Sequence, residues 1–249
     1  MPDYYHSLTP FRKLFETGVP ALTYHKLGPR PRSVQLKGLY VGEKLFTRQL
    51  AELREAGFST PPLTQIFPVA GNSQKQIALT FDDGFSNVLR HGLKPLAENK
   101  FRAIQFLVAD LIGKTNEWEQ REGEVREPLM DVAQIREWLA AGHEIGSHTL
   151  THPFLARIPL ELVREEIFSS KKKLEDLFGR PVEHFCYPYG DWNETVRDLV
   201  IAAGYKTAFT TISGVNTPSD SPFELKRFTA RYPSRNLKAA WSRLREKWQ

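Results

Sequence analysis

Short apolar runs alternate with longer amphipathic stretches along most of this 249-residue chain. A short apolar run between turn residues predicts a buried strand, whereas apolar residues spaced three and four positions apart predict a helix. The predicted strands are residues 19–24, 77–81, 103–108, 144–147, 183–187, 206–210 and 224–229. The predicted helices are residues 46–56, 88–99, 131–141, 159–178 and 194–203, with a last one from Leu237.

Strands that alternate with helices in this way favour a parallel sheet joined by crossovers. Seven such units without a second compositional zone favour closure into an α/β barrel. Between the predicted elements, residues 61–75 are expected to form a loop, and residues 113–128 a polar excursion with an exposed Trp118. We expect an N-terminal arm over 1–18 and a barrel over 19–249 that ends in an amphipathic helix at 237–248.

The composition, 41% hydrophobic and 25% charged, is typical of a soluble globular protein. A single cysteine excludes an intramolecular disulfide and a cysteine-based zinc cluster. No signal peptide or membrane-spanning run is visible in the sequence, so a cytoplasmic location is expected. The net charge of +5 favours an anionic partner over nucleic acid, for which the sequence has no recognition motif. Much of this charge lies in residues 26–37 and the last fifteen residues, where we interpret it as aiding solubility.

Two adjacent carboxylates, Asp82 and Asp83, directly follow the predicted strand 77–81 and precede Gly84. An unpaired carboxylate at the end of a buried strand must find a cation or take up a proton. Adjacent carboxylates at this position therefore suggest a metal ion, with one carboxylate left for proton transfer. The alternative is a simple turn, because Asp-Gly is a common turn dipeptide.

Other polar residues follow other predicted strands, and the carboxyl ends of parallel barrel strands meet on one face. His25 follows the first strand, His148 the fourth, and Tyr189 lies just after the fifth. On a helical turn, His148 and His152 point to one side, although such a spacing alone is a weak signal. Two histidines and one aspartate together form an open metal site, with positions left for water and substrate.

The segments Thr80-Phe81-Asp82-Asp83-Gly84 and Gly146-Ser147-His148-Thr149-Leu150-Thr151-His152-Pro153 resemble the first two motifs of the polysaccharide deacetylases. These are also called NodB-homology domains or carbohydrate esterase family four, and the resemblance extends over about residues 19–230. It implies a single-domain, distorted (β/α)7 barrel that hydrolyses an N-acetyl group on an amino sugar or glycan with metal-activated water. Asp82 is then the general base, and Asp83, His148 and His152 hold one divalent ion. Zinc is favoured, with cobalt, nickel or others as alternatives.

Two departures from the family pattern concern the base and the general acid. The third motif is usually Arg-x-Pro-Tyr, but Cys186 stands here where an arginine orients the base. Arg227 is a candidate replacement, and Tyr187, Pro188 and Arg227 are candidate substrate-binding residues. In the family, the backbone N–H of the residue that matches Tyr189 donates to the oxyanion. The resemblance implies the same role for Tyr189, because a backbone donor requires no particular side chain.

The late histidine motif is also absent, since no histidine follows His184. Thr23-Tyr24-His25 resembles the N-terminal Tyr-His of the poly-N-acetylglucosamine deacetylase subgroup, which makes His25 the expected general acid. The other histidines, His6, His91, His143 and His184, are expected at the surface or satisfied in the core.

Two alternatives remain open at this point. The same fold could hydrolyse another amide, such as a formamide on a lipid-linked sugar or a cyclic amide, and a phosphate- or lipid-linked sugar would suit the basic charge. A catalytically silent carbohydrate-binding domain is the other, but it would have lost a ligand or the base, and none is lost. The basic helix 237–248 could contact a membrane surface or pack on the barrel. The sequence carries no signal for an oligomeric state.

Overall fold

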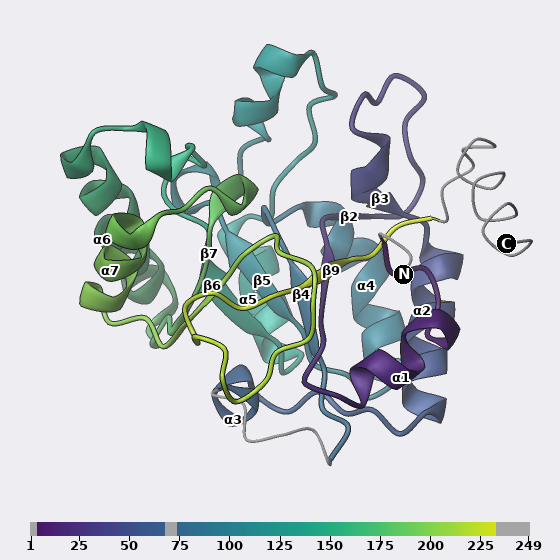
Figure 1. Ribbon diagram of the computed structural model, residues 1–249. Coiled ribbons are helices and arrows are strands. Elements are labelled where there is room, and N and C mark those ends of the chain that lie inside the picture. The colour runs from purple at the N-terminus through teal and green to yellow at the C-terminus, as the bar shows by residue number, and fades with distance from the viewer. Residues whose placement is uncertain (1–3, 68–73, 233–249) are drawn as a thin grey trace, which may run out of the picture.

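A computed structural model describes residues 4–67 and 74–232 (Figure 1). Its strands are β1 (Ala21–Tyr24), β2 (Lys26–Leu27), β3 (Tyr40–Val41), β4 (Ala78–Phe81), β5 (Ile104–Leu107), β6 (Glu144–Ser147), β7 (His184–Cys186), β8 (Thr207–Phe209) and β9 (Phe228–Thr229). Its α-helices are α1 (Arg12–Phe15), α2 (Glu43–Glu55), α3 (Leu63–Ile66), α4 (Ser86–Glu98), α5 (Val132–Ala140), α6 (Leu160–Phe178) and α7 (Glu194–Ala202). The predicted helix 237–248 lies outside the described residues.

The strands form a seven-stranded sheet in the order β8-β7-β6-β5-β4-β1-β9, in which every neighbouring pair is parallel. The sheet is curled, because the segment before β9 reaches both of its edges. Leu225 bridges to Phe209 of β8, and three residues later Phe228 pairs with Leu22 of β1. The expected single-domain α/β fold of the (β/α)7 barrel type is therefore confirmed.

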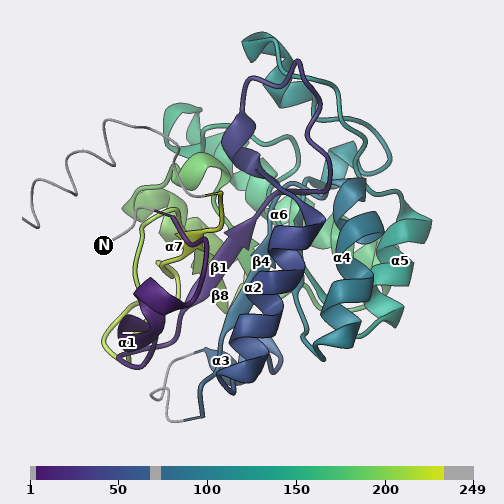
Figure 2. The same cartoon turned by 90° about the vertical axis from the view of Figure 1, so that its right-hand side faces the viewer.

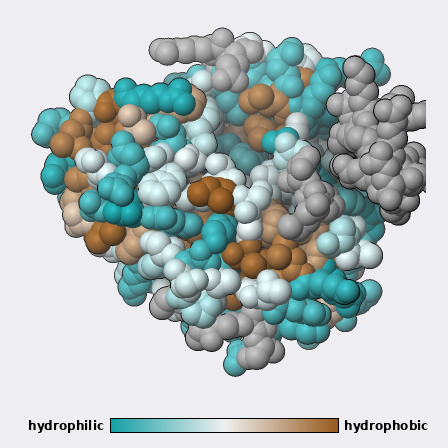
Figure 3. All heavy atoms as spheres, viewed as in Figure 1, coloured by the Kyte–Doolittle hydropathy of each residue, from teal (hydrophilic) through white to brown (hydrophobic). Residues whose placement is uncertain are grey.

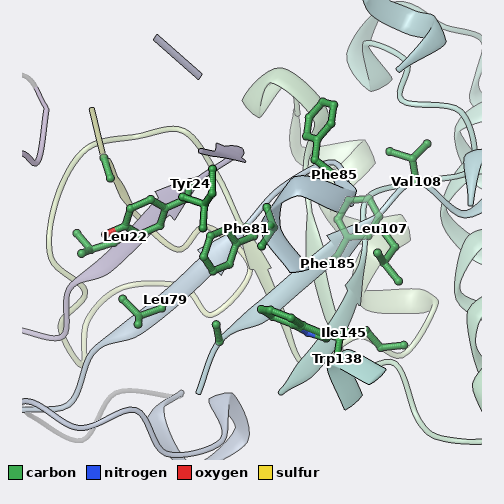
Figure 4. Close-up of a cluster of buried hydrophobic side chains, with 14 of the residues drawn as sticks. Leu22, Tyr24, Leu79, Phe81, Phe85, Leu107, Val108, Trp138, Ile145 and Phe185 are labelled. Carbon is green, nitrogen blue, oxygen red and sulfur yellow. The ribbon is translucent and has the colours of Figure 1, made fainter. Parts of the chain in front are cut away.

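Helices cover the outside of this curled sheet. Figure 2 shows α2, α4 and α5 side by side along one flank, and α6 and α7 lie together on the other side in Figure 1. In α2, the buried apolar residues follow the helical period, since Leu50 and Leu53 lie four and seven positions after Phe46. The ring of Phe46 packs edge-on against Tyr24 and Phe81, two residues of the buried cluster drawn in Figure 4, and this joins the helix to the core.

The segment before β1 packs on the same core. Tyr5 forms a parallel bridge with Ala230, and the buried rings of Phe11 and Phe15 contact Phe228. Burial of each such ring contributes on the order of 2 kcal/mol. The N-terminal residues are thereby attached to the last strand of the sheet, while the expected boundary at residue 18 stays a prediction.

The structure differs from the predicted elements in several places. The strand expected at 224–229 is reduced to β9, because Leu225 pairs with the opposite edge of the sheet. The small parallel pair of β2 and β3 was not predicted, and the expected loop at 61–75 contains the short helix α3. The helix predicted at 131–141 is confirmed as α5, with a capping box between Asp131 and Gln134. No helix within the described residues combines the length and the apolar character that crossing a membrane requires.

Candidate metal centre and catalytic site

The carboxyl ends of the strands surround a pocket with a volume of about 260 Å³. His25 directly follows β1, Asp82 and Asp83 follow β4, and His148 follows β6. Their side chains line the pocket together with His152. On the face drawn in Figure 3, hydrophobic residues lie within the hollow in the upper part of the view. The structure therefore brings these five side chains together on one face of the sheet.

Asp83 is the point on which the two motif histidines converge. Its Oδ1 lies 3.5 Å from Nε2 of His148 and 3.4 Å from Nε2 of His152. One donor atom from each of the three residues falls within 4.8 Å of the other two, and all three side chains are buried. Buried nitrogen and carboxylate donors at this separation fit a divalent ion that takes imidazole and carboxylate ligands.

The Nδ1 atoms of the two histidines have different surroundings. Nδ1 of His148 lies 2.7 Å from the carbonyl oxygen of Cys186. Because a carbonyl only accepts, Nδ1 carries a proton, and Nε2 is the nitrogen that faces Asp83. Nδ1 of His152 is buried and has no hydrogen-bond partner in the described structure. The backbone thus holds Nδ1 of one of the two motif histidines, an arrangement that is usual for metal-bound histidines.

The local backbone that presents these groups is not helical, so the helical turn considered for the spacing of His148 and His152 is not what brings them together. The residues after β6 form a loop in which Thr149 and His152 have φ values of 69° and 68°. Asp83 and Tyr189 are also left-handed, with φ values of 76° and 59°. Non-glycine residues rarely adopt this conformation, and it concentrates at functional sites where surrounding contacts enforce it. Here Glu166 supplies such contacts, because it accepts from the N–H groups of Leu150 and Thr151.

Asp82 has a different partner, Arg227. Nη1 of Arg227 lies 2.8 Å from Oδ1 and Nη2 lies 2.9 Å from Oδ2, so the guanidinium binds both carboxylate oxygens. Burial alone would raise the pKa of Asp82, but the charges of Arg227 and His25 outweigh it and hold this pKa below its ordinary value.

The guanidinium is itself fixed by the groups around it. Its Nε donates to the carbonyl oxygen of Thr210, and Nη2 lies 3.1 Å from the sulfur of Cys186. Cys186 therefore stands beside an arginine that comes from the segment just before β9. Cys186, Asp82 and His148 also offer a second set of donors within 4.8 Å. The guanidinium of Arg227 already pairs with both oxygens of Asp82, so this second set of donors is less suitable for a metal ion.

His25 faces Asp82 across the pocket. Its Nε2 lies 3.9 Å from Oδ2 of Asp82, and its side chain is 21% exposed. Burial lowers the pKa of His25, because the opposing attraction of Asp83 and Asp82 is weaker. The 3.9 Å separation leaves these two groups without a direct hydrogen bond and within reach of a common partner.

The third-motif residues occupy the remaining side of the pocket. Tyr187 and Tyr189 line it, whereas Pro188 is buried at the start of the turn and is not among the lining residues. The hydroxyl of Tyr187 donates to the carbonyl oxygen of Phe223. Tyr189 stacks on Phe154 at 3.8 Å and contacts His152 edge-on at 4.5 Å.

Trp118 and Glu119, which line the pocket, and the neighbouring Lys26 are among the residues not recognised in the sequence. Trp118, expected to be exposed, is half-buried and stacks on the ring of His152 at 4.6 Å. Glu119 also lines the pocket. Lys26, interpreted as a solubilising charge, is fully buried and pairs with Glu119 at 3.0 Å. The sequence signal available was weak: Lys26 directly follows the candidate acid His25.

The other histidines lie away from this pocket. His143 is buried, and its Nδ1 accepts from the N–H of Ala103. His184 is buried beside the hydroxyl of Thr207, and His91 lies beside Glu43. The expectation that they are surface or satisfied-core residues is in keeping with these contacts. The fold, the candidate ligand set of two histidines and one aspartate, and the second aspartate beside it fit a metal-dependent hydrolase.

Comparison with known proteins identifies the family. A family model described as polysaccharide deacetylase matches residues 70–208, more than half of the chain. The candidate polysaccharide deacetylase YxkH of Bacillus subtilis (strain 168) is 24% identical over 84% of this chain and 70% of its own length. A chitooligosaccharide deacetylase of Bradyrhizobium sp. (strain ANU 289) is 26% identical over 52% of this chain and 53% of its own length.

Among solved structures, IcaB from Ammonifex degensii superposes with a TM-score of 0.75 and is 26% identical. The match covers 91% of this chain and 97% of that one. The chain belongs to the polysaccharide deacetylase family, a family of metal-dependent amide hydrolases. The match to the family model stops short of His25 and Arg227, which lie outside residues 70–208.

Proposed function

We propose that this chain removes N-acetyl groups from an amino sugar or glycan, with Asp82 as general base and His25 as general acid. The observation that carries the proposal is the different environment of the two adjacent aspartates. Asp83 faces both motif histidines, whereas Asp82 is held by Arg227 and faces His25. This division favours metal binding by Asp83 and proton transfer by Asp82.

Asp83, His148 and His152 would hold one divalent ion, with zinc favoured and cobalt or nickel as alternatives. Such an ion supplies, when bound, a Lewis acid that polarises the acyl carbonyl and lowers the pKa of water. The Nδ1 proton of His148, donated to Cys186, keeps its Nε2 available for this role.

Asp82 accepts the proton of the attacking water as the new C–O bond forms. Arg227 supports this step in two ways, because it keeps the carboxylate ionised and fixes its orientation. Oδ1 retains a second lone pair for the water, whereas Oδ2 also lies 3.6 Å from the sulfur of Cys186. The backbone N–H of Tyr189 is proposed to stabilise the oxyanion that develops on the carbonyl oxygen.

His25, in its imidazolium form, donates a proton to the sugar nitrogen as the C–N bond breaks. The products are a free amine and acetic acid, which loses its proton to solvent to give acetate. After this step Asp82 carries a proton that His25 has lost. The 3.9 Å between Nε2 of His25 and Oδ2 of Asp82 is short enough for this proton to return through a single bridging water. The two groups are then restored for another cycle.

The substrate class is proposed from the relatives and the pocket. A relative named chitooligosaccharide deacetylase supports an N-acetylglucosamine oligomer as the first substrate to test. Among the described lining residues, the arginine is Arg227, and it is engaged with Asp82. This pocket therefore gives no charge-based support to the phosphate-linked alternative.

Acetate release from tri-N-acetylchitotriose, with stoichiometric zinc or cobalt, tests the proposal. We expect turnover that stops on chelation and returns when the ion is restored. Asp82→Asn should keep the metal and lose turnover, and Asp176→Asn on the exposed face of α6 is the matched control. A protein that binds the sugar and the ion but releases no acetate from any N-acetylated sugar would favour the silent binding domain instead.

A further inference from the structure

Trp118 forms one wall of the pocket and stands directly on a candidate metal ligand. Its ring stacks on His152 with centroids 4.6 Å apart and an angle of 23° between the planes. It belongs to a short 3₁₀ helix, Glu117–Glu122, in the connection between β5 and α5. Leu36 and Leu39, from the connection between β2 and β3, line the same pocket. We call Trp118, Leu36 and Leu39 the apolar wall.

A buried ion pair lies beside this wall. Nζ of Lys26 is 3.0 Å from Oε2 of Glu119, and the two residues are 0% and 5% exposed. The ammonium also lies 4.4 Å from the ring centre of Phe85 and 5.3 Å from that of Tyr40. The amide of Asn116 donates to the same carboxylate oxygen of Glu119. The ammonium thus has two aromatic rings and the carboxylate has an amide donor in addition to their mutual contact. A buried ion pair requires such further partners to offset its loss of hydration.

The two connections that supply the wall are fastened to each other. The carboxylate of Glu124 accepts from the backbone N–H groups of Gln35, at 3.3 Å, and Leu36, at 2.5 Å. The hydroxyl of Tyr40 donates to Glu127 at 2.5 Å. Figures 1 and 2 both show these two segments rising together from the same end of the sheet. The two connections that carry the apolar wall are therefore held together by hydrogen bonds.

We propose that the apolar wall is the surface on which the sugar ring stacks, and that Lys26 and Glu119 are the residues that position it. The inference rests on the proposed function and adds the residues that bind the ring. A sugar ring has an apolar face of C–H groups, and an aromatic ring is the side chain best suited to pack on it. A buried ion pair is weak evidence of stability, but it can fix the position of the segment that carries it.

The geometry also relates the wall to the reaction. Lys26 is the next residue after His25, and Glu119 is the next residue after Trp118. The ion pair therefore joins the segment with the proposed acid to the segment that holds the sugar. A ring stacked on the open face of Trp118 lies in the same pocket that His152 and Asp83 line. Lys26 and Glu119 act through Trp118, so they are positioning residues.

Trp118→Ala and Trp118→Phe test the stacking residue. With tri-N-acetylchitotriose, we expect the alanine variant to raise KM about tenfold, near the upper end of what one aromatic contact contributes, with kcat changed less than about twofold. Phenylalanine should restore most of the affinity, because it retains a ring. Calorimetric binding of the same sugar to the metal-free variants should show the same order. An alanine variant with unchanged KM and affinity overturns the inference.

The positioning residues require a double variant, because removing one partner leaves a buried charge unpaired and can unfold the protein. We expect Lys26→Met/Glu119→Gln to fold, to bind one metal ion per chain, and to raise KM at least roughly fivefold while kcat changes little. Lys173→Met/Asp110→Asn, which removes an exposed ion pair between α6 and the residues after β5, is the matched control. A folded double variant with the control's KM overturns the positioning role.

A spectroscopic measurement reports the position of Trp118 without turnover. Cobalt bound beside His152 should quench the fluorescence of Trp118, and Trp118→Phe should lose that part of the quenching. The double variant should show weaker quenching at full cobalt occupancy. Sugar binding that depends on Trp118 without any acetate release overturns the proposed function alone. Acetate release with a wild-type KM in Trp118→Ala overturns the apolar wall alone.

Discussion

Arg227 binds both carboxylate oxygens of Asp82, at 2.8 and 2.9 Å, although the two residues are 145 positions apart in the chain. The arginine comes from the segment that joins the two edges of the sheet, directly before β9. The proposed base is therefore oriented by a residue from the last part of the described chain.

Arg227→Lys should lower kcat roughly 10- to 100-fold, because lysine keeps the charge but cannot bind both oxygens at once. The arginine holds the pKa of Asp82 below its ordinary value, so its replacement should move the acidic limb of the kcat profile to higher pH. Steady-state rates between pH 4 and 8 measure both effects. Arg197→Lys, at an ion pair with Glu224 near the surface, is the control. An unshifted acidic limb would contradict the proposed pairing.

Substitution of Asp82 and substitution of Asp83 should cause two different defects. Asp82→Asn should lose about 10²- to 10⁴-fold in kcat and retain the ion, because it removes only proton transfer. Asp83→Asn should lose the ion itself, because it removes a charged ligand. Metal content by mass spectrometry, together with acetate release, distinguishes the two. Loss of the ion from both variants to the same extent would argue against separate roles.

His25→Ala should retain the ion and the fold, while kcat falls about 10²- to 10³-fold. Since the imidazolium form is the proposed acid, the basic limb of the kcat profile should disappear in this variant. His91→Ala, which alters a histidine beside Glu43 outside the pocket, serves as the control. Full turnover by His25→Ala would exclude it as the acid.

Stability should fall on mild acidification because of two buried histidines outside the pocket. Burial, helped by Arg102, lowers the pKa of His143 to about 4, and burial lowers that of His184 to about 4. Both pKa values are below those of the unfolded chain, so the unfolded state binds more protons between about pH 6.5 and 4. The stabilisation is complete above that window and is lost as the pH falls through it, by on the order of 2–3 kcal/mol for each histidine.

Urea unfolding at pH 7.5, 6 and 5 measures this loss. His143→Gln should be less stable than the wild type at pH 7.5 and should lose less stability on acidification. Comparison with His91→Gln separates this effect from titration of the proposed metal ligands, which both variants retain. Equal pH dependence in the two variants would contradict the assignment to His143.

The sequence predicted most of what depends on local pattern. The apolar runs located six of the seven sheet strands well, and the residues that follow β1, β4 and β6 lie on one face, as parallel strands require. The last strand was predicted too long, because Leu225 pairs with β8 while Phe228 pairs with β1. The hydrophobicity of a segment does not indicate which edge of the sheet each of its residues will pair with.

Long-range partners were the part that the sequence could not supply. Arg227 could be suggested as a substitute for the missing motif arginine, but only the closed sheet brings it to Asp82. Lys26 was misjudged because a lysine near a loop usually lies in water, and its burial depends on Glu119, 93 positions later. Trp118 was misjudged for the same reason, since a polar segment gives no sign that it folds back over His152.

The pairing of β1 with β9 has a consequence for protein synthesis. The proposed metal ligands and base are all translated by residue 152, and His25 far earlier. The strand that carries His25 obtains its second neighbour only when Phe228 emerges, and Asp82 receives its arginine one residue before that. A chain that ends before Arg227 therefore contains all three candidate ligands but lacks the residue that binds and orients Asp82.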